Sequence, residues 1–240
     1  ALPISMTETY LKKIYYDPAH PASFSGASKL HRIAKADGKN ISLRDIKEWL
    51  RGQETYTLHK QSRRRFPRNK VIVDGLDEQW DVDLMDMTSL PKYNDGVRFI
   101  LVAIDIFSRY TWLVPLKTKN GKDVTEAFGA IFQQGRRPEK IRTDKGTEFT
   151  NRTVQQYLKD QGVIHFVTQN EVKANYAERV IKTIKSRIFK YFTRKQTHRY
   201  IDVLQDFARS YNNTYHRSIK MKPADVNSSN ESSLWYQQYV

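Results

Sequence analysis

The sequence has no cysteine and no long hydrophobic run. Without cysteine, a disulfide framework and a cysteine-containing zinc site are both excluded, and an intracellular protein fits best. The longest uncharged apolar run is FILVAI, at residues 99–104, which is far too short to span a membrane. The first ten residues, ALPISMTETY, lack the basic start and apolar middle of a signal peptide. We therefore expect a soluble protein that has no membrane partner.

Acidic residues are scarce relative to basic ones. The 240 residues include 41 Lys and Arg against 26 Asp and Glu, which gives a formal net charge of +15. This excess is far larger than solubility requires, so we expect a polyanionic partner, with DNA or RNA ahead of an anionic membrane surface. The length suits one large domain with a small companion. Because the chain begins with Ala rather than Met, we treat both termini as possible edges of a longer protein.

Residues 6–56 have the pattern of three short helices. In the last of them, Leu43, Ile46, Trp49 and Leu50 fall on one stripe, and Ser42 begins a near capping box. We predict a small helical domain over residues 1–58. Two interpretations stay open, a helix-turn-helix type of DNA-binding module and a plain helical packing domain.

A basic segment, KQSRRRFPRNK, follows at residues 60–70, and Pro67 argues against a helix there. We predict a basic linker over residues 59–75 that contacts DNA phosphates, although a solvated tether is the alternative. A nuclear-import signal overlaps either use, so a nuclear location is expected. The predicted phosphate contacts are Arg63, Arg64, Arg65 and Arg68.

From residue 79 onward the pattern changes to strands. Residues 79–87, 97–107 and 110–116 are short apolar runs joined by polar turns, which is typical of an antiparallel meander. Helical and strand segments then alternate, and two long amphipathic helices are predicted at 173–196 and 200–219. We predict an α/β domain with a mixed sheet over residues 76–226. A C-terminal tail is predicted over 227–240, beginning with the polar loop or fraying linker NSSNESS.

Carboxylates recur at the ends and centres of these predicted elements. Asp81 and Asp83 share one face of a strand, Asp144 follows another strand, and Glu178 lies near the start of a long helix. Hard oxygen ligands from three separate elements, with no Cys or His cluster beside them, favour Mg²⁺ or Mn²⁺. Each carboxylate also has an ordinary interpretation. Asp144 suits a turn, Asp83 suits an arginine partner, and Glu178 suits an ion pair with Lys182.

Several motifs occur together in a recognisable order. They are WDVD at 80–83, AIDIFSRY at 103–110, IRTDKGTEF at 141–149 and KANYAERVIKTIK at 173–185. In this order the chain resembles the catalytic core of the retroviral integrase and DDE transposase superfamily over about residues 60–226. Its tail, YNNTYHRSIKMKPADV, resembles integrases of Polinton (Maverick) DNA transposons. The resemblance implies an RNase H-like fold with a mixed five-stranded sheet and flanking helices.

The resemblance also implies a function. A polynucleotidyl transferase of this superfamily nicks the ends of its element's DNA and joins the freed 3′ hydroxyl groups to a target strand. Asp83, Asp144 and Glu178 would then be the catalytic triad and would hold two Mg²⁺ or Mn²⁺ ions. Asp83 is preferred to Asp81 because the family places its Asp three residues after the Trp. The resemblance implies double-stranded DNA, both transposon ends and target, as the partner, and a homo-oligomer, dimer or tetramer.

Other acidic residues fit the pattern less well. Glu148 lies too near Asp144 to be the third carboxylate, Glu171 falls in the preceding loop, and Asp105 begins a turn, where we interpret it as structural. The 33 residues between Asp144 and Glu178 are two fewer than in most retroviral relatives, which a shorter loop would absorb.

The helix after Glu178 carries the best candidates for DNA contacts. Lys182 and Lys185 lie four and seven residues after Glu178 and so share its face. Retroviral integrases have lysines at these offsets that contact DNA ends. A solvated face with an ion pair is the alternative. Arg179 and Lys145 complete the predicted DNA-binding residues.

The chain also departs from the retroviral pattern. His20, His31 and His59 have no ligand spacing, so the N-terminal helices are expected to fold without zinc. The basic domain expected after the core is missing, which suggests a fragment. Two alternatives to an active enzyme remain, a domesticated, non-catalytic DNA-binding protein derived from a transposon integrase, and a structure-selective nuclease.

Overall fold

The computed structural model describes residues 4–59, 71–167 and 176–240. The predicted linker arginines at 63, 64, 65 and 68 lie outside these ranges, as does Glu171. The helices and strands are α1 (Ile4–Tyr16), α2 (Ala27–Ala36), α3 (Leu43–Arg51), α4 (Glu54–Thr57), β1 (Gln79–Asp86), η1 (Pro91–Tyr93), β2 (Phe99–Asp105), β3 (Thr111–Leu116), α5 (Gly121–Phe132), β4 (Lys140–Thr143), α6 (Thr147–Thr150), α7 (Arg152–Asp160), β5 (Ile164–Val167), α8 (Tyr176–Lys195), η2 (Ile201–Val203), α9 (Leu204–Asn212), η3 (Pro223–Asp225) and α10 (Glu231–Tyr239).

The chain divides into two compact units. One, the helical unit, consists of Ala1–Arg65 with Thr183–Thr214, and the other, the sheet unit, consists of Phe66–Lys182 with Tyr215–Val240. The linear division predicted at residues 58, 75 and 226 stays a prediction. In the described ranges, no helix has both the length and the apolar character that crossing a membrane requires.

The sheet unit contains a five-stranded mixed sheet in the order β3-β2-β1-β4-β5. β1, β2 and β3 form the predicted antiparallel meander, whereas β4 pairs in parallel with β1, and β5 with β4. β1 therefore lies at the centre, where Asp81 is the parallel partner of Arg142 and Asp83 faces Val102 across the antiparallel pair. The predicted α/β class and the mixed sheet are confirmed.

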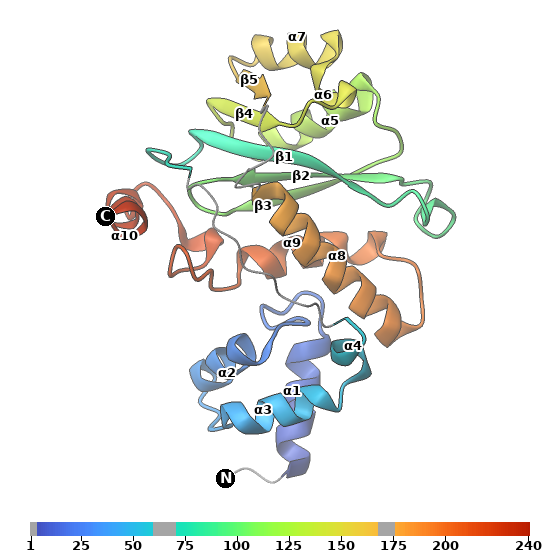
Figure 1. Cartoon of the computed structure of the whole chain (residues 1–240), viewed down its shortest axis with the longest axis vertical. Helices are drawn as coiled ribbons and strands as arrows, with labels where there is room; N and C mark the ends of the chain where they lie inside the picture. Colours follow the sequence, from blue (N-terminus) through green and yellow to red (C-terminus); the bar gives the residue numbers. More distant parts are fainter. Residues whose placement is uncertain (1–3, 60–70, 168–175) are drawn as a thin grey trace. The chain divides into compact units, whose positions relative to one another are not determined.

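One face of the sheet carries the main apolar core. Side chains alternate between the faces of a strand, so Trp80 and Val82 point to this face and Asp81 and Asp83 to the other. Trp80 is fully buried and its ring stacks on Trp112 at 4.2 Å. α5 and α7 pack their buried side chains into the same cluster, and Figure 1 shows α5, α6 and α7 on one side of the sheet.

The predicted polar tail contains a helix. The polar segment forms a turn only as far as Asn230, after which α10 begins, with Leu234 buried. α10 is held by hydrogen bonds within the sheet unit, since Tyr239 Oη accepts from Val73 N at 3.3 Å and Gln238 Oε1 accepts from Arg109 Nη2 at 3.1 Å. The fraying predicted for residues 231–233 is therefore wrong. The apolar and hydrogen-bonding residues that follow anchor the segment.

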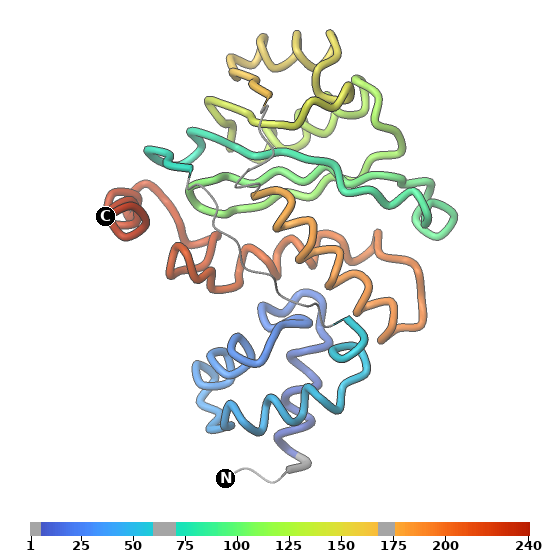
Figure 2. The backbone as a smooth tube through the Cα atoms, in the orientation of Figure 1, coloured from blue at the N-terminus to red at the C-terminus, as the bar shows by residue number. Residues whose placement is uncertain are grey.

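The helical unit contains the three predicted N-terminal helices, which Figure 2 traces in blue to cyan. α3 begins where the capping pattern predicts, because Ser42 Oγ accepts from Asp45 N at 3.1 Å. Leu30, Ile46 and Leu50 are buried in this unit. The choice between a DNA-binding module and a packing domain stays open.

The second long helix, predicted over residues 200–219, is wrong. The segment forms a short 3₁₀ turn and then α9, which ends at Asn212. Asn and Thr are weak helix formers, and the Thr214 hydroxyl, just after α9, contacts both Ser210 O in α9 and Pro21 O at 2.8 Å. A bridge between His216 and Met221 then replaces the predicted final turns.

Candidate active site

Asp83 lies in the middle of β1, half-buried, with its Oδ1 accepting from the backbone N–H of Leu84 at 2.8 Å. Burial raises its pKa from 3.8 to about 6, against the opposing effect of the Leu84 hydrogen bond. The negative charges of Asp144, Asp81 and Glu178 raise this pKa further. Asp144 and Glu178 are therefore each close enough to act electrostatically on Asp83, and the surroundings of Asp83 hold an excess of negative charge.

The sheet register explains why Asp83 and Asp144 are neighbours. β1 and β4 run parallel, with Asp81 opposite Arg142. Two residues further along the two strands lie Asp83 in β1 and Asp144 directly after the end of β4. Asp144 is exposed, and its Oδ1 accepts from Gly146 N at 3.0 Å. The exposed Asp144 carboxylate therefore lies at the end of β4 beside the half-buried Asp83 carboxylate.

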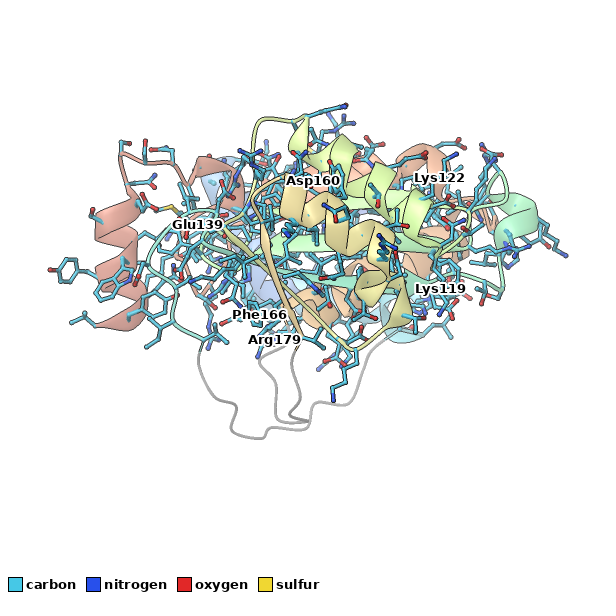
Figure 3. All side chains as sticks on the ribbon, turned by 90° about the horizontal axis from the view of Figure 1, so that it is seen from above. Lys119, Lys122, Glu139, Asp160, Phe166 and Arg179 are labelled. Atoms are coloured by element: carbon cyan, nitrogen blue, oxygen red, sulfur yellow. The ribbon has the colours of Figure 1, made fainter. Side chains whose placement is uncertain are left out.

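Gly146 permits a close approach of two carboxylates. A Cβ atom at this position would lie 2.9 Å from Asp144 Oδ1 and 2.7 Å from Glu148 Cδ. Glu148 forms an ion pair with Lys119 at 3.7 Å. Lys119 lies just before α5 and Glu139 just before β4, and Figure 3 shows the two residues at opposite ends of the sheet. Glu148 thus has a cationic partner of its own, and Gly146 leaves the space in which both acids fit.

A hydrogen-bonded chain supports the end of β4. The Thr143 hydroxyl donates to Asp144 O at 2.8 Å and lies 2.9 Å from His165 Nε2 on β5. Gln155 Nε2 donates to His165 Nδ1 at 2.7 Å and to Phe149 O at 2.8 Å, which fixes the orientation of its amide. Nε2 of His165 therefore carries the proton, and burial lowers the pKa of this histidine. Sequence reasoning missed this support, since no motif marks it.

Asp81 has a structural role that sequence reasoning also missed. It is 4% exposed, and its Oδ1 accepts from Arg142 Nε at 2.9 Å. Its Oδ2 accepts from the first two backbone N–H groups of α8, from Tyr176 at 2.7 Å and from Ala177 at 3.0 Å. A carboxylate at a helix N-terminus satisfies amides that have no partner inside the helix and interacts favourably with the helix dipole. Asp81 thus fixes the first two residues of α8, which directly precede Glu178, on the sheet.

Glu178 lies in the first turn of α8. Its side chain is 47% exposed, and Oε1 lies 3.6 Å from Lys182 Nζ, so the ion pair considered from the sequence is present. A surface pair of this kind contributes little stability and opens readily. Glu178 can therefore exchange Lys182 for another cation at little cost.

The predicted DNA-binding residues near the triad are mostly exposed. Lys145 follows Asp144, the Lys182 side chain is 62% exposed, and the Arg179 guanidinium lies 5.4 Å from the Tyr176 ring centroid. Arg179 is labelled in Figure 3. Lys185 is half-buried in the part of α8 that belongs to the helical unit. Their contacts with DNA stay predictions.

Asp105, in contrast, is a buried carboxylate that binds other residues of the fold. It is fully buried and accepts from the backbone N–H groups of Phe107 and Ser108, each at 3.1 Å. Arg136 Nη2 forms an ion pair with it at 2.8 Å. These contacts agree with the structural interpretation of Asp105.

The chemistry of the triad suits a hard cation, because all its donors are carboxylate oxygens in a negatively charged site. Across the described part of the chain, however, no three His, Cys, Asp or Glu side chains are arranged as a finished ligand set. Asp144 and Glu178 have exposed or half-exposed side chains that are able to turn. The metal-binding role of Asp83, Asp144 and Glu178 stays a prediction.

Comparison with known proteins identifies the segment that holds Asp83 and Asp144. Residues 77–171 match the family described as Integrase core domain. A transposon-derived protein of Caenorhabditis elegans is 42% identical over 141 residues, which cover 58% of this chain and 49% of that protein. The retrovirus-related Pol polyprotein from transposon TNT 1-94 of Nicotiana tabacum is 31% identical over 98 residues, covering 39% of this chain and 7% of the polyprotein. The chain thus spans about half the length of the nematode relative.

Solved structures share the fold. A chain in the cryoEM structure of the simian T-cell lymphotropic virus intasome in complex with the PP2A regulatory subunit B56 gamma superposes with a TM-score of 0.62 at 13% identity, covering 97% of this chain and 72% of that one. The HTLV-2 integrase catalytic core domain in complex with magnesium gives a TM-score of 0.52 at 16% identity, covering 62% and 95%. The predicted RNase H-like fold is confirmed, and residues 77–171, which are less than half of the chain, are similar in sequence to the Integrase core domain family.

Proposed function

We propose that the chain is a Mg²⁺- or Mn²⁺-dependent DNA integrase of a transposable element, of the Polinton (Maverick) type. Its reactions would be 3′-end processing of the transposon DNA and transfer of the processed strand into target DNA. The observation that carries the proposal is the half-buried Asp83, whose pKa is raised to about 6 by burial and by three neighbouring carboxylates. A site that concentrates negative charge in this way is suited to a divalent cation.

The proposed chemistry is an in-line displacement at phosphorus. In processing, a water oxygen attacks a phosphodiester near the transposon end and the bond to the 3′ oxygen breaks. In transfer, the freed 3′ oxygen attacks a target phosphorus, loses its proton and displaces a target 3′ oxygen. Bound metal ions would activate the attacking oxygen and stabilise the leaving oxygen.

The residues of this chain would divide the remaining work. Asp83, Asp144 and Glu178 would hold the ions, and Asp81 would position Glu178 by fixing the start of α8. Lys145, Arg179, Lys182 and Lys185, with the linker arginines, would contact DNA phosphates. Two DNA ends that act in concert imply a dimer or tetramer on DNA, and an intasome is the assembly in which the simian viral relative was solved. A nuclear location follows from the substrate.

The direct test is a strand-transfer assay with labelled transposon-end duplexes and Mg²⁺ or Mn²⁺. The Asp144→Asn variant is expected to lose joined products and to keep its affinity for DNA. Asn keeps the oxygen that accepts from Gly146 N, so the local fold should persist, whereas the charge that a metal ion needs is removed. Joining by Asp144→Asn at the wild-type rate would contradict the proposal.

A second candidate function is a domesticated, non-catalytic DNA-binding protein. It is favoured by one observation, namely that no three potential ligands in the described residues are arranged to hold a metal ion. The same assay separates the candidates. Tight DNA binding without joined products from either the wild type or Asp144→Asn, repeated with a longer chain, would support the binding protein.

Gly146→Ala tests the geometry around Asp144. We expect strand transfer to fall about a hundredfold, because the new Cβ would force the Asp144 and Glu148 side chains apart and small misplacements of reacting groups are costly. Stability should change by less than about 1 kcal/mol, since only the ends of side chains must move and the backbone φ of −58° suits Ala. Strand-transfer rates and denaturant midpoints measure the two effects.

Gly129→Ala is the matched control in the same unit. A Cβ at Gly129 would meet nothing closer than Tyr157 Oη at 3.4 Å, and α5 should accept Ala. Wild-type transfer by Gly129→Ala and reduced transfer by Gly146→Ala are expected. Equal rates for the two variants would show that the approach of Asp144 and Glu148 is unimportant.

A further inference from the structure

Arg187, on the part of α8 that belongs to the helical unit, carries a buried positive charge. It is 4% exposed, and burial lowers its pKa to about 10. Its Nη1 donates to the Ser210 hydroxyl at 3.1 Å, and that hydroxyl donates to His20 O at 2.7 Å. These contacts place the guanidinium beside the turn at residues 20–25. The Ser210 hydroxyl is a neutral group, although a buried guanidinium is costly without a negative charge nearby.

Two further cations lie beside Arg187 in the helical unit. Lys190 Nζ, one turn along α8, donates to Phe24 O at 3.1 Å. Lys29 comes from α2. Burial and the charge of Arg187 lower the pKa of each lysine to about 8. Three positive charges from two helices are therefore held together in a partly dehydrated place, where they repel one another.

The same turn contains two buried hydroxyl groups that form no hydrogen bond with the described residues. Ser23 and Ser25 are 0% and 8% exposed, and among the described residues the hydroxyl of neither has a hydrogen-bond partner. They flank Phe24, whose carbonyl binds Lys190. A buried hydroxyl without a partner costs free energy, and such groups are usually satisfied by a bound molecule or ion.

α2 begins in the same region, two residues after Ser25. Its N-cap is Gly26, which gives no side-chain hydrogen bond, and a Cβ built on Gly26 would meet nothing within 4 Å. The space beside Gly26 is thus open at the N-terminus of α2, where the helix dipole favours a negative charge. Cations, hydroxyls and helix amides all suit one kind of ligand, an oxyanion with several acceptor oxygens.

We propose that Lys29, Arg187 and Lys190, together with the Ser23 and Ser25 hydroxyls, form a binding site for a phosphate group in the helical unit. The phosphate belongs either to a nucleic-acid backbone or to a free polyphosphate. A bound phosphate neutralises the mutual repulsion of the three cations and satisfies the two hydroxyls. The site belongs to the helical unit, whereas the three carboxylates belong to the sheet unit, and phosphate binding does not depend on catalysis by them.

The first experiment titrates the whole chain with sodium tripolyphosphate and follows binding by calorimetry and the thermal unfolding midpoint. Wild type is expected to bind and to be stabilised. Lys29→Gln and Lys190→Gln are expected to bind about tenfold more weakly, because each removes one charge-assisted contact. Lys35→Gln on α2 and Lys195→Gln on α8 are matched controls, since both lysines are exposed on the same helices, and wild-type affinity is expected.

The second experiment identifies the source of the phosphate. Binding of a random-sequence DNA duplex is measured against salt concentration for the same variants. A slope reduced by about 0.9 in Lys29→Gln and Lys190→Gln, but not in the controls, assigns the site to a DNA phosphate. An unchanged slope with weakened tripolyphosphate binding assigns it to a free polyphosphate.

One combined result would overturn the proposal. If Lys29→Gln and Lys190→Gln match their controls in both experiments, the cluster binds no phosphate and serves only to pack the turn. Neither experiment measures strand transfer, so failure of this inference and failure of the proposed integrase activity remain distinguishable.

Discussion

Asp83→Asn is expected to make the metal-free protein more stable and, at the same time, to abolish strand transfer. The carboxyl of Asp83 has a pKa of about 6 in the folded protein, against an ordinary value of 3.8. A raised pKa means that the folded state binds the proton more tightly than the unfolded state. Stability is therefore lost as pH rises from about 4 to about 6, and the penalty is complete above pH 6.

The size of both effects follows from the same carboxylate. A shift of this size corresponds to about 3 kcal/mol at neutral pH, which Asn should recover because it does not ionise and still accepts from Leu84 N. Strand transfer should fall by at least about a thousandfold, since loss of a metal ligand removes several kcal/mol of transition-state stabilisation. Urea denaturation between pH 4 and pH 7, with and without Mg²⁺, and strand-transfer rates measure the two effects.

Asp86→Asn is the matched control for this prediction. Asp86 lies on the same strand, is exposed, and accepts from Thr88 through one oxygen, which Asn retains. Added Mg²⁺ should stabilise this variant as much as it stabilises the wild type, because Asp86 is not among the proposed metal ligands. The prediction fails if Asp83→Asn is less stable than wild type at pH 7, or if Mg²⁺ still stabilises it as it does the control.

Removal of Asp81 should have the opposite effect on stability. Asp81→Ala is expected to lower the free energy of unfolding by about 3–5 kcal/mol, because it deprives the buried Arg142 of its carboxylate and the first amides of α8 of their acceptor. Strand transfer should also fall, since Glu178 follows directly after these amides. Asp81→Asn should behave similarly, because the NH₂ group of Asn would face a donor on either side, the Arg142 guanidinium or the first N–H groups of α8.

A double variant separates the positioning role of Asp81 from its contribution to stability. Asp81→Leu with Arg142→Leu removes both members of the buried ion pair, and apolar replacement of such pairs is often neutral. We expect the double variant to recover the part of the stability lost through the buried charge but not strand transfer, since α8 still lacks its acceptor. Rates are compared below every unfolding transition. Full recovery of transfer would show that Asp81 does not position Glu178.

The same variants examine the alternative in which Asp81 is itself a metal ligand. If that alternative held, Mg²⁺ would no longer stabilise Asp81→Asn, and Asp83→Asn would keep its response. The positioning role predicts the reverse, namely a Mg²⁺ response that is weakened by Asp81→Asn and lost in Asp83→Asn. Thermal unfolding with and without Mg²⁺ distinguishes the two.

Local patterns were sufficient to predict much of the fold. The alternation in residues 80–83 correctly separated Trp80 and Val82 from Asp81 and Asp83, because neighbouring side chains on a strand always point to opposite faces. Ser42 predicted the start of α3, since its hydroxyl reaches an amide only three residues away. These features depend on interactions within a few residues, which the sequence specifies directly.

Predictions failed where distant contacts decide the outcome. The helix predicted over 200–219 ends at Asn212, and the Thr214 hydroxyl contacts Pro21 O, which is far away in the chain, as well as Ser210 O. The polar start of the tail gave no sign that α10 would be held by residues such as Val73 and Arg109. Helix propensity and polarity are weak signals, and tertiary hydrogen bonds override them.

The sequence by itself determined the acidic residues of the site, the order of the elements that carry them and the excess of positive charge around them. Only the tertiary structure decided how the two neighbouring aspartates of β1 are used. Asp81 binds Arg142 and the start of α8, and so it is satisfied inside the protein, whereas the pKa of Asp83 is raised by burial and by the charges of Asp144, Asp81 and Glu178. Two identical side chains on one strand face differ in this way because the partners of a buried charge come from distant parts of the chain.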